Sequence, residues 1–304
     1  MKRLCKPFTI LFLVLSPIMP ITGATPLQTA MPGTVVRHVV RSPQLGEDVD
    51  VDVWLPAGYS RHAAPYPVIY MHDGQNLFDA STTWNHQTWN VDSVAGRLAA
   101  SGEIEAPVIV GIHSNPETRI GDLMPQRALE ASPASMKGMG EMVLCGDRYG
   151  DFIVNTLKPL VDTVYNVRTD AASTSVMGSS MGGIVSVYLM CEYPDVFGAA
   201  AGLSTHWIGF TDGEPEPDFV NAVYRYLESN LPADGAHRLY LDRGTETVDA
   251  HYGPADDKMT GLAESKGYRR PVSLETYVDK GAPHEENAWM RRVGRPLRFL
   301  LGGH

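Results

Sequence analysis

Short apolar runs alternate with longer segments of mixed, helix-compatible residues over most of this 304-residue chain. The runs are short enough for buried strands and are bounded by turn-forming residues. They cover residues 68–71, 108–112, 173–177, 199–203, 238–241 and 272–278. The clearest helix candidates are residues 149–164 and 219–229. Strands that alternate with helices are typical of a mostly parallel sheet with helices on both faces, so this α/β architecture is predicted.

The first strands follow a different pattern. Residues 34–41 and 48–55 flank a Pro- and Gly-containing turn, and between Asp48 and Val53 aspartate alternates with valine. This period of two predicts an antiparallel hairpin with one solvent-exposed face. No repeat, low-complexity linker or second domain boundary is evident, so one domain is expected over residues 25–304. The long segments 114–140 and 204–236 are expected to build a pocket.

The strongest chemical signal is Gly178-Ser179-Ser180-Met181-Gly182. An apolar strand candidate runs into this motif and a helix-compatible stretch, residues 184–192, follows it. That context is typical of a nucleophile elbow, in which a strained turn exposes one serine hydroxyl. Of the two serines, only Ser180 has glycines two residues before and after it, so Ser180 is the predicted nucleophile.

A serine nucleophile needs a base, and five histidines follow the elbow. His284 lies in a turn-rich loop directly after the last strand candidate, where it can reach back to Ser180. His206 is expected to line the site instead. The supporting acid is expected in the loop after residues 238–241. In proteins with a nucleophile elbow the chain order is Ser, then Asp or Glu, then His. Asp249 is favoured and Glu246 is the alternative; Asp242 is expected to cap the turn.

Four segments resemble the esterase D and feruloyl esterase group of α/β-hydrolases, also named the putative esterase family. They are His72-Asp73-Gly74-Gln75-Asn76-Leu77-Phe78 with its preceding strand, Val110-Gly111-Ile112 with Arg119, the elbow, and Gly244-Thr245-Glu246 followed by Gly281 to His284. The resemblance covers residues 35 to 300. It implies an α/β-hydrolase fold and acyl-ester hydrolysis. It also implies an oxyanion hole formed by the backbone N–H groups of Met181 and Gln75.

The expected substrate contacts come from the pocket segments and the loop after residues 68–71. They are Asp73, Trp89, Arg119, His206 and Trp207. Family resemblance implies an ester of a feruloyl or acetyl group on plant polysaccharide, with a siderophore lactone or acyl transfer as alternatives. A non-catalytic binding module is a further alternative, which the intact Ser180, His284 and candidate acids disfavour. No cofactor is expected, and the spacing of His, Cys and acidic residues gives no zinc-type motif, so no metal is expected either.

The amino terminus predicts export. A basic start precedes an apolar run over residues 7–21 and the small residues Thr22-Gly23-Ala24. This is the pattern of a secretory signal peptide cut after Ala24, and the run is too short to span a bilayer comfortably. Cleavage removes three basic residues and no acid, which changes the formal net charge from −10 to −13. A periplasmic or secreted protein is expected, with no stable membrane insertion after cleavage.

The acidic balance argues against nucleic acid as a partner, because binding it requires a basic patch. A small-molecule or polysaccharide-linked ester is the expected partner, and the oligomeric state is not set by the sequence. Cys145 and Cys191 remain after cleavage. Export permits a disulfide between them, but the position of Cys191 after the elbow favours a buried thiol equally well, so pairing stays open.

Overall fold

The structure is a computed structural model that describes residues 26–27, 33–83, 85–136, 139, 142–209, 214–233 and 237–302. The expected signal peptide and its cleavage site lie outside the described residues. No helix in the described part of the chain is both long and apolar enough to cross a membrane.

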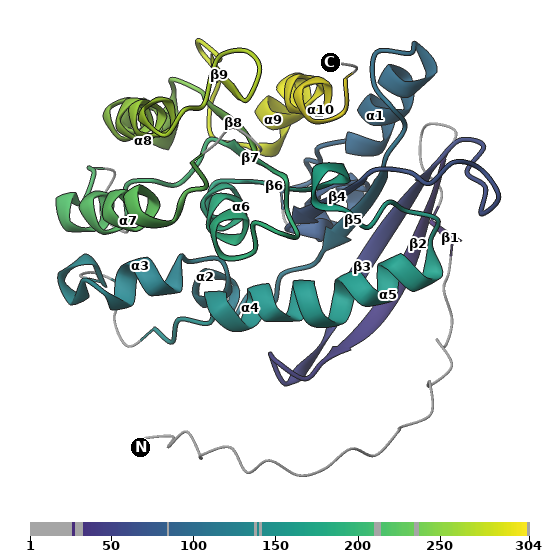
Figure 1. Ribbon diagram of the computed structural model, residues 1–304, viewed down its shortest axis with the longest axis horizontal. Helices are drawn as coiled ribbons and strands as arrows, with labels where there is room; N and C mark the ends of the chain where they lie inside the picture. Colours follow the sequence, from purple (N-terminus) through teal and green to yellow (C-terminus); the bar gives the residue numbers. More distant parts are fainter. Residues whose placement is uncertain are drawn as a thin grey trace.

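A nine-stranded sheet with the order β1-β2-β3-β5-β4-β6-β7-β8-β9 forms the centre of the molecule (Figure 1). Its strands are β1 (Pro26–Leu27), β2 (Gly33–Ser42), β3 (Glu47–Pro56), β4 (Val68–His72), β5 (Val108–Ile112), β6 (Thr174–Ser179), β7 (Ala199–Leu203), β8 (Arg238–Arg243) and β9 (Leu274–Val278). The strands from β4 to β9 run parallel, whereas β1, β2 and β3 pair antiparallel. The predicted N-terminal hairpin and parallel sheet are therefore confirmed.

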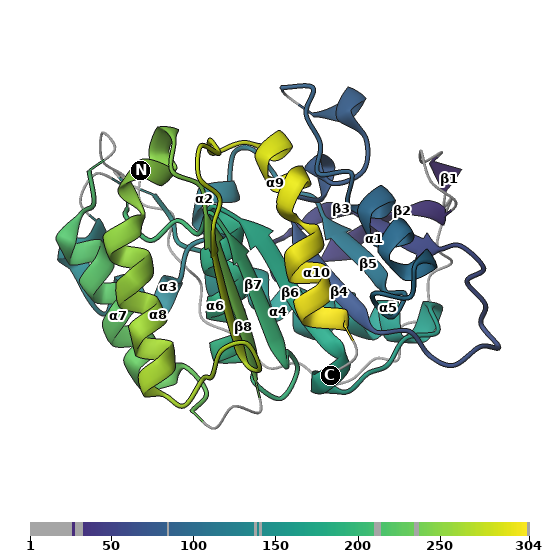
Figure 2. The ribbon, with the colours of Figure 1, turned by 90° about the horizontal axis from the view of Figure 1, so that it is seen from above.

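Helices cover both faces of the sheet, as Figures 1 and 2 show. They are α1 (Val91–Ala100), α2 (Arg119–Asp122), α3 (Gln126–Glu130), α4 (Gly146–Phe152), α5 (Lys158–Val164), α6 (Met181–Glu192), α7 (Pro217–Asn230), α8 (Gly253–Ser265), α9 (Glu286–Arg292) and α10 (Gly294–Leu301). Two buried apolar clusters separate the layers. One packs the sheet against residues of α3 to α8, and the other packs it against α1, α9 and α10.

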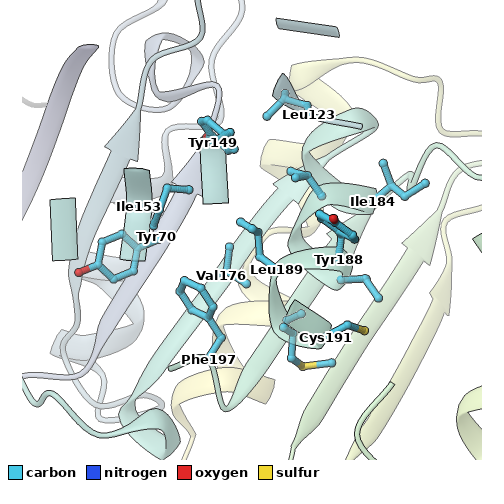
Figure 3. Close-up of a cluster of buried hydrophobic side chains, with 14 of the residues drawn as sticks. Tyr70, Leu123, Tyr149, Ile153, Val176, Ile184, Tyr188, Leu189, Cys191 and Phe197 are labelled. Carbon is cyan, nitrogen blue, oxygen red and sulfur yellow. The ribbon is translucent and has the colours of Figure 1, made fainter. Parts of the chain in front are cut away.

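Successive side chains along a strand belong alternately to the two clusters. In β4, Val68 and Tyr70 belong to the cluster under α3 to α8, and Ile69 and Met71 belong to the opposite one. Successive side chains of a strand point to opposite faces, so a strand buried on both sides is apolar throughout. Figure 3 shows part of the larger cluster, where Tyr70 and Phe197 lie near side chains of α6. Their rings meet edge to face with centroids 6.2 Å apart.

The helix predicted over residues 149–164 differs in detail. It begins earlier, as α4, and a π-helical turn (Ile153–Leu157) joins it to α5. Pro159 lies in the first turn of α5 and has no backbone N–H. An i→i−4 bond is therefore impossible there, which agrees with a change in winding at this point.

The strand order places the reaction centre. The parallel part of the sheet starts at β4, which has β5 on one side and β6 on the other. Loops that leave neighbouring parallel strands in opposite directions create a crevice at their carboxyl ends. The loop after β4 carries Asp73 and Gln75, and the turn after β6 carries Ser180. The loops that follow β8 and β9 carry Asp249 and His284 to the same edge.

Candidate active site

Ser180 occupies a strained turn between β6 and α6. Its φ of 53° and ψ of −120° are rare for a residue with a side chain. Such a conformation costs about 1–3 kcal/mol and persists only where the surrounding structure fixes it. Here the Ser180 N–H donates to the Leu203 carbonyl at 2.9 Å, and the Ser180 carbonyl accepts from the N–H of His206 at 3.1 Å. Both bonds tie the turn to β7 and the loop after it.

The glycines on either side make this turn possible. A Cβ on Gly178 would lie 2.7 Å from the carbonyl carbon of Gly182, inside any allowed contact. A Cβ on Gly182 would lie 3.2 Å from the Cβ of His72 at the end of β4. The first glycine is therefore required by the close approach of its own turn, and the second by the packing of α6 against the neighbouring strand.

His284 and Asp249 lie in direct contact. His284 Nδ1 is 2.6 Å from Asp249 Oδ1, and the carboxylate accepts this hydrogen bond. The imidazole ring is held edge to face between Tyr252, at 5.7 Å between centroids, and Trp289, at 5.0 Å. The bond and the two rings fix the orientation of the imidazole.

The second oxygen of Asp249 is held from behind by a buried network. Asp249 Oδ2 accepts from the Ser204 hydroxyl at 2.5 Å and from the Gly244 N–H at 2.6 Å. Ser204 Oγ in turn accepts from Trp289 Nε1 at 3.0 Å and from Arg292 Nη2 at 2.7 Å. A carboxylate bonded on both oxygens has one orientation, which is the condition for orienting a base.

Two neighbouring aspartates carry opposite pKa shifts. Burial alone would raise the pKa of Asp249, but its bond to His284, the charge of that histidine and the donors on its other oxygen hold the pKa below 3.8. Asp242 is fully buried, and burial raises its pKa to about 6 against the opposing charge of Arg292. Arg292 Nε donates to Asp242 Oδ1 at 3.0 Å. Asp249 is therefore the carboxylate that stays ionised beside the imidazole.

The alternatives for the acid lie elsewhere. Glu246 is exposed, and its side chain makes no bond to His284 in the described structure. Asp242, expected as a turn cap, lies inside the molecule instead, where it bonds to Arg292 and to the hydroxyl of Tyr240. That expectation is wrong because the strand that ends at Arg243 is buried on both faces at this point.

Tyr252 is a site residue that the sequence analysis missed. It follows the 3₁₀ turn Thr247–His251 that presents Asp249, and its side chain is fully buried. Burial raises the pKa of Tyr252, and a hydrogen bond with the Ser180 hydroxyl opposes this shift. Between Ser180 and His284, both described, no hydrogen bond is formed. Hydrogen bonds between a nucleophile and its base often form only when substrate binds, so this separation is compatible with such a pair.

His206 lies on the far side of Tyr252. Its Nδ1 is 3.0 Å from the Tyr252 hydroxyl, and the ring is absent from the walls of the described cleft. Burial and, secondarily, the charge of His284 lower the pKa of His206 to about 4. The ring is therefore neutral at pH 7, and it contacts the site through Tyr252 rather than from the cleft.

The loop after β4 is fixed by an ion pair. Arg119 donates two bonds to Asp73, each 2.7 Å long, and the Ser114 hydroxyl donates to Asp73 Oδ1 at 2.7 Å. Burial would raise the pKa of Asp73, but the charge and bonds of Arg119 lower it. Gln75 donates from Nε2 to Ser114 Oγ at 2.9 Å. These contacts fix the backbone around Gln75 next to the elbow.

Ser180 and His284 open into a cleft of about 810 Å³. Asp73, Gln75 and Arg119, which the sequence analysis named as candidate site residues, line it. The rest of its wall comes mainly from residues with polar side chains in the loop after β4, the loop after β5, the end of β6 and α9 with the residue before it. These residues are Asn76, Thr83, Asn85, Gln87, Ser114, Pro116, Ser179, Glu285, Glu286 and Trp289. The sequence analysis had named none of these ten as a candidate site residue.

The interpretation of Trp89 and Trp207 as substrate contacts is wrong. Trp89 is 3 % exposed and packs against Trp289, and Trp207 is 1 % exposed. Trp207 Nε1 donates to the buried Asp256 at 3.0 Å. Neither side chain reaches the cleft because both complete the apolar clusters on the two faces of the sheet.

The two cysteines are not bonded to each other. Cys145, next to α4, and Cys191, in α6, are both buried and carry free thiols. Burial raises the pKa of the Cys191 thiol, so it stays protonated. Across the described residues, no group of three or more His, Cys, Asp or Glu side chains is arranged to hold a metal ion.

The sheet order, the strained turn between β6 and α6 and the contact between His284 and Asp249, carried by the loops after β9 and β8, are the arrangement of an α/β-hydrolase. The chain belongs to the Putative esterase family, whose sequence profile matches residues 42–289. The predicted family and fold class are thus confirmed, and the protein is a carboxylic ester hydrolase.

Comparisons with individual proteins agree with this membership. The chain is 24 % identical to the uncharacterized protein YbbA of Bacillus subtilis (strain 168), over 82 % of this chain and 91 % of that protein. A ferulic acid esterase from Anaeromyces mucronatus, solved with ferulic acid, is 17 % identical with a TM-score of 0.61, covering 94 % of this chain and 97 % of its own. An enterobactin esterase from Shigella flexneri is 17 % identical with a TM-score of 0.65, covering 90 % of this chain but only 60 % of its own. At these identities the solved structures establish the fold.

Proposed function

We propose that this esterase is an exported serine carboxylesterase with Ser180 as nucleophile, His284 as base and Asp249 as the supporting acid. The observation that carries the proposal is the 2.6 Å bond between His284 and a fully buried Asp249, beside a serine held at positive φ. A nucleophile, a base within the same cleft and a third group that orients the base are the parts that acyl transfer needs.

In the first step, the Ser180 hydroxyl leaves Tyr252 and attacks the ester carbonyl while His284 Nε2 takes its proton. The Cα of Ser180 stays in place, because the turn is fixed by its backbone bonds. Asp249 remains ionised and stabilises the imidazolium. His284 then gives the proton to the leaving alcohol, and water repeats the sequence on the acyl-enzyme.

The negative charge on the carbonyl oxygen needs donors. Met181 is the first residue of α6, so its N–H has no carbonyl one turn earlier within the helix to bond. The helix N-terminus also favours negative charge. We place the second donor at the N–H of Gln75, whose side chain is fixed on Ser114. Removing one such donor typically costs about 10²–10³ in turnover.

For the substrate we propose a feruloyl or acetyl ester of a polysaccharide, with a siderophore lactone as the alternative. The structural similarity to a ferulic acid esterase supports the first and that to an enterobactin esterase the second. Export rests on the pattern of residues 1–24. Amino-terminal sequencing of the protein recovered outside the cytoplasm should begin at Thr25; a chain that begins at Met1 would contradict cleavage.

Hydrolysis of p-nitrophenyl acetate by the wild type, Ser180→Ala and Ser179→Ala tests the proposal. Ser179 is the matched control, since it lies next to the nucleophile and lines the same cleft. We expect Ser180→Ala to abolish turnover and Ser179→Ala to retain most of it. Failure of the wild type on this and other aryl esters, or equal activity of Ser180→Ala, would overturn the proposal.

A further inference from the structure

Two carboxylates directly follow the proposed base. Glu285 and Glu286 are the next residues after His284, and both line the cleft. Consecutive Cα atoms are about 3.8 Å apart, so both acids begin within about 8 Å of the Cα of the base. The other ionisable residues on the cleft wall, His284 aside, are Asp73 and Arg119. Those two form their own ion pair, which leaves the two glutamates as the net charge of the described cleft.

Neutral amides position both glutamates. Asn85 Nδ2 donates to Glu286 Oε2 at 2.6 Å, and Asn76 Nδ2 lies 3.5 Å from its Oε1. Gln87 Nε2 lies 3.4 Å from Glu285 Oε2. In the described part of the chain, neither glutamate forms an ion pair with Lys, Arg or His. Amide donors orient a carboxylate without cancelling its charge, so this wall of the cleft is acidic.

The mechanism decides which part of the substrate lies along this wall. The base returns its proton to the oxygen of the leaving alcohol, so that alcohol must lie against His284. The acyl oxygen lies on the opposite side, toward Met181 and Gln75. Because Glu285 and Glu286 continue the chain from His284, they border the alcohol rather than the acyl group.

We propose that this acidic wall, formed by Glu285 and Glu286, selects esters by the charge of the alcohol. Esters of cationic alcohols are preferred over esters of neutral alcohols, and these over esters of anionic alcohols. The inference rests on the proposed function, because it needs the roles of Ser180 and His284. Together, two carboxylates at about 5–7 Å in a water-filled cleft change the relative rate by about fivefold for each unit of charge on the alcohol. The effect is on the choice of substrate and leaves the chemical step unchanged.

Three acetates of matched length test it: acetylcholine, 3,3-dimethylbutyl acetate and 2-acetoxyethanesulfonate. They carry a positive, a neutral and a negative group at the same distance from the ester oxygen. The kcat/KM for each is measured by acid release and divided by its rate of hydroxide-catalysed hydrolysis, which removes differences in intrinsic reactivity. The wild type is compared with Glu285→Gln. Glu228→Gln, an exposed charge on α7, is the matched control.

We expect the corrected kcat/KM to fall about fivefold from the cation to the neutral ester and again to the anion. Glu285→Gln should shrink the cation-to-anion ratio by about fivefold, and Glu228→Gln should leave that ratio unchanged. The wild-type ratio should also shrink in 0.5 M salt, a test that does not need a variant to fold. Hydrolysis of all three esters at equal corrected rates, or a reversed order, would overturn the inference but leave the esterase assignment intact. If the wild type hydrolyses none of the three esters, the result would instead count against the proposed function.

Discussion

The reaction centre and the acidic wall both depend on carboxylates, but they hold them differently. Asp249 is fully buried and bonded on both oxygens by groups that the fold itself fixes, among them Ser204 and the backbone of Gly244. Glu286 is held by amide side chains from a loop some 200 residues earlier in the chain. The first arrangement would orient the proposed base for any ester. The second lines the cleft and can change without disturbing Asp249, so we expect it to set specificity.

The largest effect is expected from the acid of the reaction centre. Asp249→Asn should lower kcat by about 10⁴, because the amide stabilises the wrong tautomer of His284 and cannot balance its charge. Glu246→Gln, the matched control, should cost far less since Glu246 is exposed and does not contact the imidazole. Hydrolysis rates and circular dichroism of both variants check this. A larger loss of kcat in Glu246→Gln than in Asp249→Asn would assign the role of the acid to Glu246.

Asp256, just behind the reaction centre, should make stability depend on pH. Burial raises the pKa of Asp256 to about 7, only partly offset by the bond from Trp207 and the charge of Arg243. Since this lies above the value of about 3.9 in the unfolded chain, the stability that the neutral carboxyl contributes is fully present below about pH 4 and is lost progressively between about pH 4 and 7. The loss is up to about 4 kcal/mol.

Urea unfolding of the wild type and Asp256→Asn between pH 4 and 8 measures this contribution. Asparagine stays neutral and can still accept the bond from Trp207, so the variant should gain stability relative to the wild type as the pH rises. Parallel curves for the two proteins would show that Asp256 ionises normally.

Ser204→Ala tests the network that holds Asp249. The change removes one bond to Asp249 Oδ2 and leaves Trp289 Nε1 and Arg292 Nη2 without their shared acceptor. We expect a loss of about 1–3 kcal/mol in the free energy of unfolding. We also expect kcat to fall by about tenfold or more, because a residue that orients a site group through a hydrogen bond typically has an effect of this size. Unchanged kcat in a folded variant would mean that Gly244 alone orients the acid.

The smallest effect is expected in the acidic wall. Asn85→Ala removes the short bond to Glu286 and frees one end of the loop after β4. KM should rise by a few-fold with kcat nearly unchanged, the result expected when binding common to ground and transition states is lost. A fall in kcat with constant KM would show that the wall also takes part in the chemistry.

The sequence pattern indicates the proposed nucleophile more clearly than it indicates the acidic wall, and the reason is local. Gly178 and Gly182 lie two residues before and two residues after Ser180, and the β-strand pattern before them predicts where the turn falls. The sequence leaves Asp249 and Glu246 both open as the acid, because only two residues of loop separate them and only folding shows that Asp249 is buried and Glu246 exposed.

The acidic wall left no pattern to find. Asn85 and Glu286 are 201 positions apart, and amides and carboxylates are common on any surface. The prediction for the tryptophans failed for the opposite reason. They are conspicuous in the sequence, but burying their large apolar side chains stabilises the fold. Trp89 and Trp207 therefore lie in the core, and smaller polar residues line the cleft.

Labelling with a fluorophosphonate tests the central claim most directly, because it reports the activated hydroxyl without reference to any substrate. The intact mass of the treated protein should increase by one adduct, and peptide sequencing should place it on Ser180. The adduct should be absent in Ser180→Ala and slow to form in Asp249→Asn. An adduct on Ser179, or labelling that continues in Ser180→Ala, would contradict the account.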